Sequence, residues 1–232
     1  MLFNRDLLKQ RWITPDFSPV VIPERLAALN HDKYNRLVGG MVLKYSIPVF
    51  YLKSGTIIDI CCGSGFGASI LSKSGYKVIG VDSDPQIINI CKLRETENLK
   101  FTVGNLMHMD RLNVGKFDCV TLIDAIEHFQ KEDQPKAIKK IMLCMNKESI
   151  LVIDTPLNRV SYKQNRNHLW VLDWNDFGDL ITSAGLSIVD RYLIRCDLGK
   201  QSYIIRASDR PELNKTDYEQ GIDQVIVAKL EA

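Results

Sequence analysis

Residues 56–68 pass from a short apolar run through an acidic residue into a glycine-rich loop. The run Thr56–Ile60 has the composition of a buried strand, and glycines follow at positions 63, 65 and 67. Glycine lacks a Cβ atom, so this loop allows the backbone to lie directly against a ligand. The segment that begins at Ala68 predicts a helix, and the N-terminus of a helix carries a partial positive charge. The pattern predicts a strand–loop–helix unit that binds a small, polar, adenosine-like ligand.

The same loop also fits a dinucleotide-binding fingerprint. Gly63, Gly65 and Ala68 have the required spacing, and Asp82 follows Gly63 by 82 − 63 = 19 residues, where an NAD ribose ligand would be. Asp59 argues against this interpretation because a carboxylate before the glycines would repel a pyrophosphate. S-adenosylmethionine carries an ammonium, a sulfonium and no phosphate, so it suits the acid better. A nicotinamide enzyme is the weakest alternative, since nothing after residue 82 resembles a dehydrogenase site.

Further segments repeat the order of motifs found in one large family. They are Lys77–Asp82, which ends in an acid, Lys100–Leu106, Lys116–His128 with its Phe-Asp and Glu-His pairs, and Thr155-Pro156. With them, the chain resembles the class I S-adenosylmethionine-dependent methyltransferases over roughly residues 55–185. The loop resembles a subgroup with Asp-Ile-Ala-Cys-Gly-x-Gly-Tyr-Gly. Cys61 replaces the usual first glycine of the family and is interpreted as a tolerated small residue, while Asn105 replaces a usual aspartate.

The expected fold is a Rossmann-like, doubly wound α/β fold. Alternating strand and helix patterns predict the double winding, and the family resemblance implies a seven-stranded sheet whose last strand is antiparallel. Predicted strands include 56–61, 149–154, 187–194 and 224–230, and predicted helices include 31–42, 66–73 and 84–94. Helices are also expected after Pro135, with Ile138, Ile141, Met142 and Met145 on one face, and after Asp173.

The chain is predicted to form one domain. At 232 residues it is too short for two independent α/β domains by the usual size range. Residues 1–30 contain three prolines and are expected to form an N-terminal arm, followed by a single domain over 31–232. Residues 156–172 and 196–223 are expected to face the substrate.

The resemblance implies a donor site for S-adenosylmethionine at the carboxyl ends of the strands. Asp82 is expected to hold the ribose hydroxyls, and Asn105 to contact the adenine. Asp59 is expected to order the loop through backbone N–H groups. His31 and Tyr34 loosely resemble an N-terminal motif that closes over the methionine end, with plain packing as the alternative. The complete set of expected cofactor contacts is His31, Tyr34, Asp59, Cys61, Gly63, Gly65, Asp82, Ser83, Asn105, Leu106 and Asp124.

Two histidines are candidates for catalysis. His128 follows the fourth predicted strand, and its ordinary pKa suits proton removal near neutral pH. His168 follows the fifth strand, on a segment expected to face the acceptor. A framework role is the alternative for His128. Together with Asp124 and Glu127, the two histidines also resemble the metal site of small-RNA 2′-O-methyltransferases, but the motif departs from that pattern, and we expect no metal.

Composition limits the classes of partner. A net charge of +2 gives no signal for nucleic-acid binding. The charged N-terminus does not read as a signal peptide, and Lys44 and Pro48 interrupt the most apolar stretch. We therefore expect a cytoplasmic enzyme without a membrane segment.

The predicted activity is methyl transfer from S-adenosylmethionine to a hydroxyl of a small molecule or glycan. One alternative is an RNA 2′-O-methyltransferase that uses a divalent metal. Another is a ligand-binding relative that has lost transfer, which Cys61 and Asn105 would explain. The oligomeric state is not encoded in these patterns.

Overall fold

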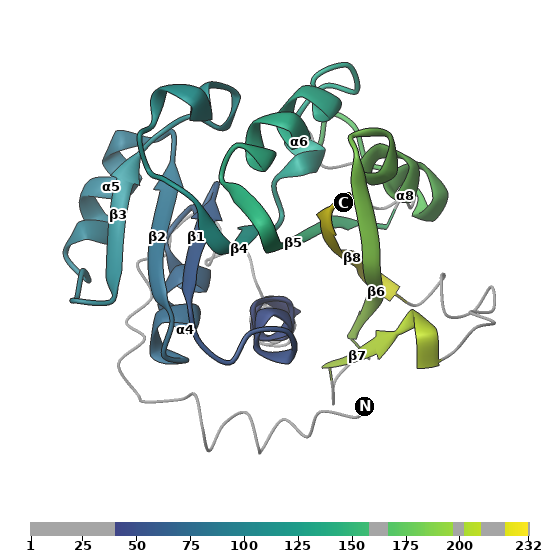
Figure 1. Ribbon diagram of the computed structural model, residues 1–232, viewed down its shortest axis with the longest axis horizontal. Helices are drawn as coiled ribbons and strands as arrows, with labels where there is room; N and C mark the ends of the chain where they lie inside the picture. The colour runs from purple at the N-terminus through teal and green to yellow at the C-terminus, as the bar shows by residue number, and fades with distance from the viewer. Residues whose placement is uncertain (1–39, 158–166, 197–201, 210–220, 232) are drawn as a thin grey trace.

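The computed structural model describes residues 40–157, 167–196, 202–209 and 221–231, which form one eight-stranded sheet with helices on both faces (Figure 1). The strand order is β3-β2-β1-β4-β5-β8-β6-β7. The strands are β1 (Thr56–Ile60), β2 (Lys77–Asp82), β3 (Leu99–Val103), β4 (Phe117–Leu122), β5 (Met145–Pro156), β6 (Leu186–Cys196), β7 (Ser202–Arg206) and β8 (Gly221–Leu230).

The first five strands are parallel, and the C-terminal part of the sheet is mixed. β2 pairs with β1 and β3, and β4 pairs with β1 and β5, always in parallel register. β8 runs antiparallel to both β5 and β6. The predicted doubly wound fold with an antiparallel last strand is therefore confirmed. The carboxyl ends of β1 to β5 consequently meet along one edge of the sheet.

The predicted number of seven strands was wrong, because β7 adds an eighth at the edge. It pairs antiparallel with β6 and lies inside segment 196–223, the second of the segments expected to face the substrate. Ile204 supplies the physical reason, since its side chain is only 4% exposed and anchors the strand in the core. A short strand in which one described side chain is buried leaves little periodic signal in a sequence.

Two hydrophobic cores fill the two faces of the sheet. One lies beneath the helix over residues 40–46, the short helix η1 (Ile47–Phe50), α4 (Phe66–Lys73) and α5 (Pro85–Lys92). The other lies beneath η2 (Leu106–Arg111), α6 (Gln134–Met142) and α8 (Trp174–Ser183). Figure 1 shows α6 and α8 on one side of the sheet and α4 on the other. Two short helices, η3 (Ile126–His128) and η4 (Ala207–Asp209), complete the described elements.

The predicted helix signals largely match the structure. The Asp84 carboxylate accepts hydrogen bonds from the Gln86 and Ile87 amides at the start of α5. Asp173 caps α8 in the same way. One assignment was wrong, since α6 ends at Met142 and Met145 is the first residue of β5. Met145 is still buried, so the core uses it from a strand.

The N-terminal part of the chain lies mostly outside the described residues. This applies to the predicted arm over 1–30 and to residues 31–39 of the predicted helix. Residues 40–46 are helical and lead directly into η1, so the described chain is helical from Gly40 to Ser46. Within the described residues, no helix has the length and apolar character needed to cross a membrane.

Candidate functional site

Asp59 lies at the base of the glycine-rich loop, with its side chain completely buried. Its carboxylate accepts a hydrogen bond of 2.7 Å from the Thr121 hydroxyl and a longer one of 3.2 Å from the Tyr45 hydroxyl. The backbone amide of Ala68, in α4, also donates to it. Burial nevertheless raises the pKa of Asp59 to about 7, because desolvation outweighs these bonds. The acid therefore ties β1, β4, α4 and the helix over 40–46 together beneath the loop.

The loop needs unusual backbone angles. Gly65 caps α4 with φ of 70°, and an added Cβ would fall 2.6 Å from the Phe101 ring, so only glycine fits without displacement. Cys61 has φ of 58°, in the left-handed region that favours glycine. This angle accounts for the glycine that the family usually has there. Burial and the neighbouring carboxylates raise the pKa of the Cys61 thiol to about 12, so it remains protonated at neutral pH.

Asp82, at the end of β2, holds the loop from the neighbouring strand. Its two carboxylate oxygens accept hydrogen bonds from the amides of Gly63 (2.9 Å) and Asp84 (3.0 Å). Each oxygen has a second lone pair that remains available to a ligand. Ser83 follows on the exposed surface. The carboxylate thus already orders the loop that it was predicted to share with a ribose.

Asn105 and Leu106 lie just beyond the end of β3. The Asn105 side chain is exposed, and its oxygen accepts a hydrogen bond of 2.9 Å from the Met107 amide at the start of η2. Leu106 is buried in the core beneath η2 and α6. Asn105 therefore has a structural role as a helix cap, and it follows the end of β3, the strand that pairs with the strand of Asp82.

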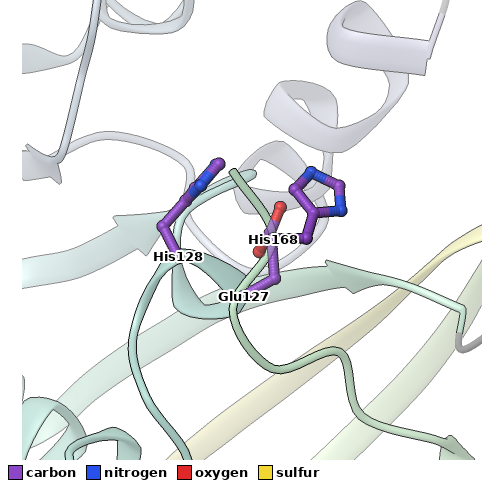
Figure 2. A group of neighbouring side chains, drawn as sticks. All are labelled: Glu127, His128 and His168. Carbon is purple, nitrogen blue, oxygen red and sulfur yellow. The ribbon is translucent and has the colours of Figure 1, made fainter. Parts of the chain in front are cut away.

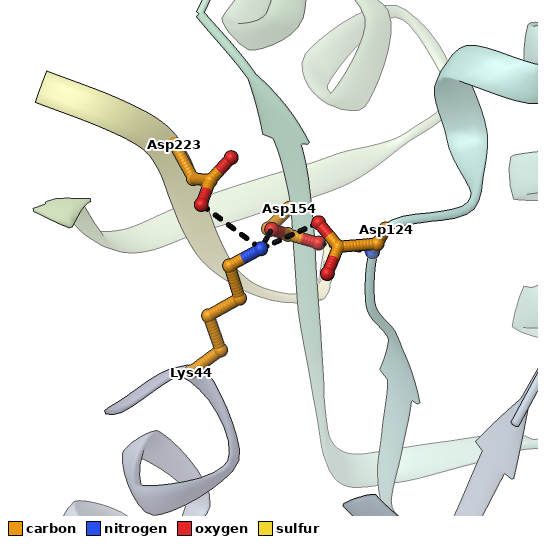
Figure 3. Close-up of polar contacts among 4 residues, drawn as sticks. All are labelled: Lys44, Asp124, Asp154 and Asp223. Atoms are coloured by element: carbon orange, nitrogen blue, oxygen red, sulfur yellow. Dashed lines mark hydrogen bonds and ion pairs between the residues drawn. The ribbon is translucent and has the colours of Figure 1, made fainter. Parts of the chain in front are cut away.

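A lysine on the helix over 40–46 joins three aspartates near the ends of β4, β5 and β8 (Figure 3). The Lys44 ammonium lies 2.5 Å from an oxygen of Asp124, 2.7 Å from Asp154 and 3.0 Å from Asp223. We call these four residues the Lys44 cluster. Burial lowers the pKa of Lys44, but the three carboxylates outweigh it and raise that pKa well above its usual range, so the side chain is cationic.

Asp124 is the most exposed carboxylate of the Lys44 cluster. Its side chain is 37% exposed, whereas that of Asp154 is completely buried. Its backbone has φ of 52°, and its amide donates a 2.6 Å hydrogen bond to Asp154. The chain is therefore held in a strained turn that presents the Asp124 carboxylate at the edge of the sheet.

Glu127, His128 and His168 form a second group close to the Lys44 cluster (Figure 2). Their ligand atoms all lie within 4.8 Å of one another. Glu127 lies between the two imidazoles, whose ring centroids are 5.2 Å apart at 81°. Burial and the carboxylates of Asp154 and Asp124 raise the pKa of Glu127 well above its usual range. The structure thus brings together the two histidines that are 40 residues apart in the sequence (168 − 128).

Backbone hydrogen bonds hold His168 against η3. The amides of Leu169 and Trp170 both donate to the carbonyl oxygen of Glu127, at 2.8 and 3.1 Å. The buried side-chain amide of Gln134 bridges the carbonyls of Ile126 (3.0 Å) and Trp170 (2.9 Å). These hydrogen bonds between the segment of His168 and the residues of η3 therefore fix the position of His168.

Most of the predicted site residues gather along the carboxyl edge of the parallel strands. This group contains Asp59, Cys61, Gly63, Gly65, Asp82, Ser83, Asn105, Leu106, Asp124, His128 and His168. His31 and Tyr34 lie outside the described residues, as do 158–166 of the first expected acceptor segment and 197–201 and 210–220 of the second.

Sequence reasoning missed several residues that complete this edge. They are Lys44, Tyr45, Thr121, Asp154 and Asp223. An acid at the end of an otherwise apolar strand was a usable signal for Asp154. The sequence also contained a signal for Lys44. It is a single lysine in the apolar stretch from Gly40 to Leu52, and a buried lysine needs carboxylates as partners.

Comparisons with known proteins agree on one family. A methyltransferase-domain family matches residues 30–187, which is more than half of the chain. Ubiquinone biosynthesis O-methyltransferase of Xanthomonas campestris is 23% identical over 120 residues, covering 50% of this chain and 49% of that protein. The chain spans about half the length of the first curated relatives that it matches.

Solved structures show the same fold at low sequence identity. Magnesium protoporphyrin IX methyltransferase from Synechocystis, solved with bound SAH, aligns with a TM-score of 0.64 and 14% identity over 98% of each chain. A SAM-dependent methyltransferase from Archaeoglobus fulgidus aligns with a TM-score of 0.64 and 18% identity, covering 84% of this chain and 94% of that chain.

Proposed function

This chain belongs to the family of S-adenosylmethionine-dependent methyltransferases, and from that premise we propose that it methylates a hydroxyl group of a small molecule or glycan. We propose further that the donor binds along the carboxyl ends of β1 to β4. The observation that carries this proposal is the Gly63 amide bound to the Asp82 carboxylate, because it joins the glycine loop and the acid of the next strand into one surface.

Asp82 is proposed to bind the donor ribose. Two hydroxyls that donate to one carboxylate contribute on the order of 2–4 kcal/mol. The amides of Gly63 and Asp84 fix the carboxylate before the ligand arrives, so little side-chain entropy is lost on binding. Ser83 lies beside it on the exposed side of the same turn.

The remaining donor contacts follow from their positions on the same edge. Asn105 and Leu106 are proposed to contact the adenine after β3. Gly63, Gly65 and Cys61 are proposed to lie against the methionine part, with Asp59 supporting the loop from below. The predicted contribution of His31 and Tyr34 at the methionine end stays part of this proposal.

The electrostatics of this edge favour a cationic ligand. The Lys44 cluster contains one ammonium and three carboxylates, and Asp124 is its most exposed acid. Asp82 adds a further carboxylate at the neighbouring strand end. S-adenosylmethionine brings an ammonium and a sulfonium, so its binding reduces repulsion among these acids.

Methyl transfer proceeds by in-line displacement. The acceptor oxygen forms a bond to the methyl carbon, the bond from that carbon to sulfur breaks with its electron pair remaining on sulfur, and S-adenosylhomocysteine is released. Much of the catalysis comes from alignment of donor and acceptor. A hydroxyl must also lose its proton, which passes to water, and His128 and His168 are proposed to make that loss easier, because they lie beyond Asp124 on the same edge.

The acceptor class is inferred from this chemistry and from the relatives. Two proteins that resemble this chain have names that refer to small organic molecules, ubiquinone biosynthesis in one case and magnesium protoporphyrin IX in the other. Trp170 is 39% exposed next to His168, with the Lys131 ammonium 4.6 Å from its ring centre. An exposed aromatic face beside the proposed transfer point suits an acceptor with a flat ring. Segments 156–172 and 196–223 are proposed to complete its site.

The test is a methyl-transfer screen with donor labelled on its methyl group. The acceptors are phenols, catechols and sugars. Each is tested beside its own methyl ether, a control in which the hydroxyl is blocked. We expect label in the hydroxyl compounds alone, and a Trp170→Ala variant to raise KM for ring-containing acceptors. Label found only in amines or thiols would overturn the proposed acceptor class.

A further inference from the structure

We propose that Glu127, His128 and His168 bind a divalent transition-metal ion and that this ion activates the acceptor hydroxyl. The second part rests on the proposed function, whereas the binding of the ion itself does not. This proposal replaces the metal-free expectation drawn from the sequence. It names a ligand set of two imidazole nitrogens and one carboxylate oxygen, without Asp124.

The three side chains are already close enough to converge on one ion. Their ligand atoms lie within 4.8 Å of one another. Two ligands that each lie about 2.1 Å from an ion are at most about 4.2 Å apart, so any contraction that binding needs is at most several tenths of an ångström. His128 is exposed and His168 is half-buried, so rotations of their side chains can supply this movement.

Glu127 provides the observation that points to a ligand. Glu127 is only 1% exposed. Among the residues that the structure describes, its Oε2 atom accepts no hydrogen bond. A buried carboxylate oxygen without a partner is expensive to keep in a folded protein. Figure 2 shows this carboxylate between the two imidazoles. A cation bound by all three residues would satisfy that oxygen.

The hydrogen bond of His128 leaves the correct nitrogen for a metal. Its Nδ1 atom lies 2.7 Å from the carbonyl oxygen of Asn167. A carbonyl can only accept, so Nδ1 carries the proton and donates, and in the neutral ring Nε2 has a free lone pair. A histidine that donates its other N–H to a backbone carbonyl is the usual arrangement for a metal ligand, because that bond fixes the tautomer and orients the ring.

The neighbouring acidic group does not compete for the ion. Asp124, Asp154 and Asp223 also bring oxygen atoms within 4.8 Å of one another. They already surround the Lys44 ammonium at 2.5–3.0 Å, so a cation of the protein itself lies among them. The two groups therefore differ. The three aspartates already hold the Lys44 ammonium, whereas Glu127, His128 and His168 offer nitrogen and oxygen ligands that an ion can reach from the solvent past the exposed His128.

The ligand types define the class of ion. Two imidazoles and one carboxylate suit Mn²⁺, Fe²⁺, Co²⁺ or Zn²⁺ better than Mg²⁺, which prefers oxygen ligands. Three protein ligands leave at least one coordination position open. An ion held by these three residues would lower the pKa of a hydroxyl placed there, so that the hydroxyl would lose its proton to bulk water more easily before its oxygen attacks the methyl carbon, with the atoms otherwise balanced as in the proposed transfer.

The test measures binding of Mn²⁺ to the full, tag-free chain by the loss of the electron paramagnetic resonance signal of free Mn²⁺. We expect one saturable site in the wild type. His128→Ala and His168→Ala are each expected to weaken its Kd on the order of 100-fold, since each removes one of three ligands. His108→Ala is the matched control, because His108 is exposed and distant in sequence from the group, and it should bind as the wild type does.

Glu127→Gln tests the buried carboxylate with little change in shape, and Glu132→Gln, at an exposed position, is its control. If Glu127→Gln does not fold, the two histidine variants still decide the result. Absence of a saturable Mn²⁺ site in folded wild-type protein, or unchanged Kd in both histidine variants, would overturn the proposal. Binding of S-adenosylhomocysteine is measured on the same samples, so a failed metal site with intact donor binding is distinguished from a failed donor site.

Discussion

Replacing Lys44 with methionine removes the only ammonium of the Lys44 cluster while keeping most of the apolar stem. The side chain is 3% exposed, and its nitrogen lies 2.5, 2.7 and 3.0 Å from three carboxylates. At an effective dielectric constant of about 20, each contact corresponds to about 5–7 kcal/mol of gross Coulomb attraction. The cost of desolvating four ions offsets most of this, so the net value of the cluster is small.

The loss in the variant is larger than that net value, because the buried side chains of Asp154 and Asp223 are left without their cation. Removal of one partner from a buried ion pair typically costs about 3–5 kcal/mol. We expect Lys44→Met to lower the free energy of unfolding by this amount, measured by urea denaturation at pH 7. Asp154→Asn in the same chain should restore part of the loss. The asparagine oxygen can still accept the bond from the Asp124 amide, and one buried charge is removed.

The matched control is Lys53→Met, which changes an exposed lysine in the same region of the sequence. It should alter stability by no more than about 0.5 kcal/mol. A Lys44→Met variant that unfolds within about 1 kcal/mol of the wild type would refute the reasoning. So would a double variant with Asp154→Asn that is less stable than Lys44→Met alone.

Three further predictions concern the loop. The pKa of Asp59, raised to about 7, means that the folded state holds this proton more tightly than the unfolded state, so its contribution to stability falls by about 3 kcal/mol as pH rises from 4 to 7. Asp59→Asn should flatten the pH profile of urea unfolding over that range, and parallel profiles would contradict this. Gly67→Ala places a Cβ 1.8 Å from the Tyr45 ring and should lower Tm, whereas a shift of less than about 2 °C would mean that the ring moves aside. Cys61→Val should destabilise the chain by about 2 kcal/mol more than Cys61→Gly, because a β-branched residue is strained at φ of 58°, and equal stabilities would dismiss that strain.

The parts of the fold with strong local signals could be predicted from the sequence. The helix cap at Asp84 and the strand ending in Asp82 combine two or three independent cues within a few residues. β7 gave no comparable cue, since Ile204 is its one described side chain that is fully buried. Met145 fitted a helical stripe, but the sheet extends far enough to take it into β5.

The candidate site likewise contains residues that could be predicted from local sequence signals and residues that could not. Asp59 and Asp82 are adjacent to strand ends, so their edge of the sheet follows from the parallel order alone. Lys44 contacts carboxylates 80, 110 and 179 positions away (124 − 44, 154 − 44 and 223 − 44), and no local pattern encodes contacts of that range. His168 likewise meets His128 through contacts between distant segments, among them the bond from the Leu169 amide to the Glu127 carbonyl, a backbone contact that is independent of side-chain identity.

The central claim is a donor site at the ends of β1 to β4, and calorimetric titration with S-adenosylhomocysteine tests it most directly. We predict one site with a Kd in the micromolar range, no heat with NADH, and at least about tenfold weaker binding in Asp82→Asn, which keeps one acceptor oxygen. Asp179→Asn, at an exposed position of α8, should bind as the wild type does. Folded wild-type protein that gives no heat with S-adenosylhomocysteine, or an Asp82→Asn variant that binds it unchanged, would contradict the account.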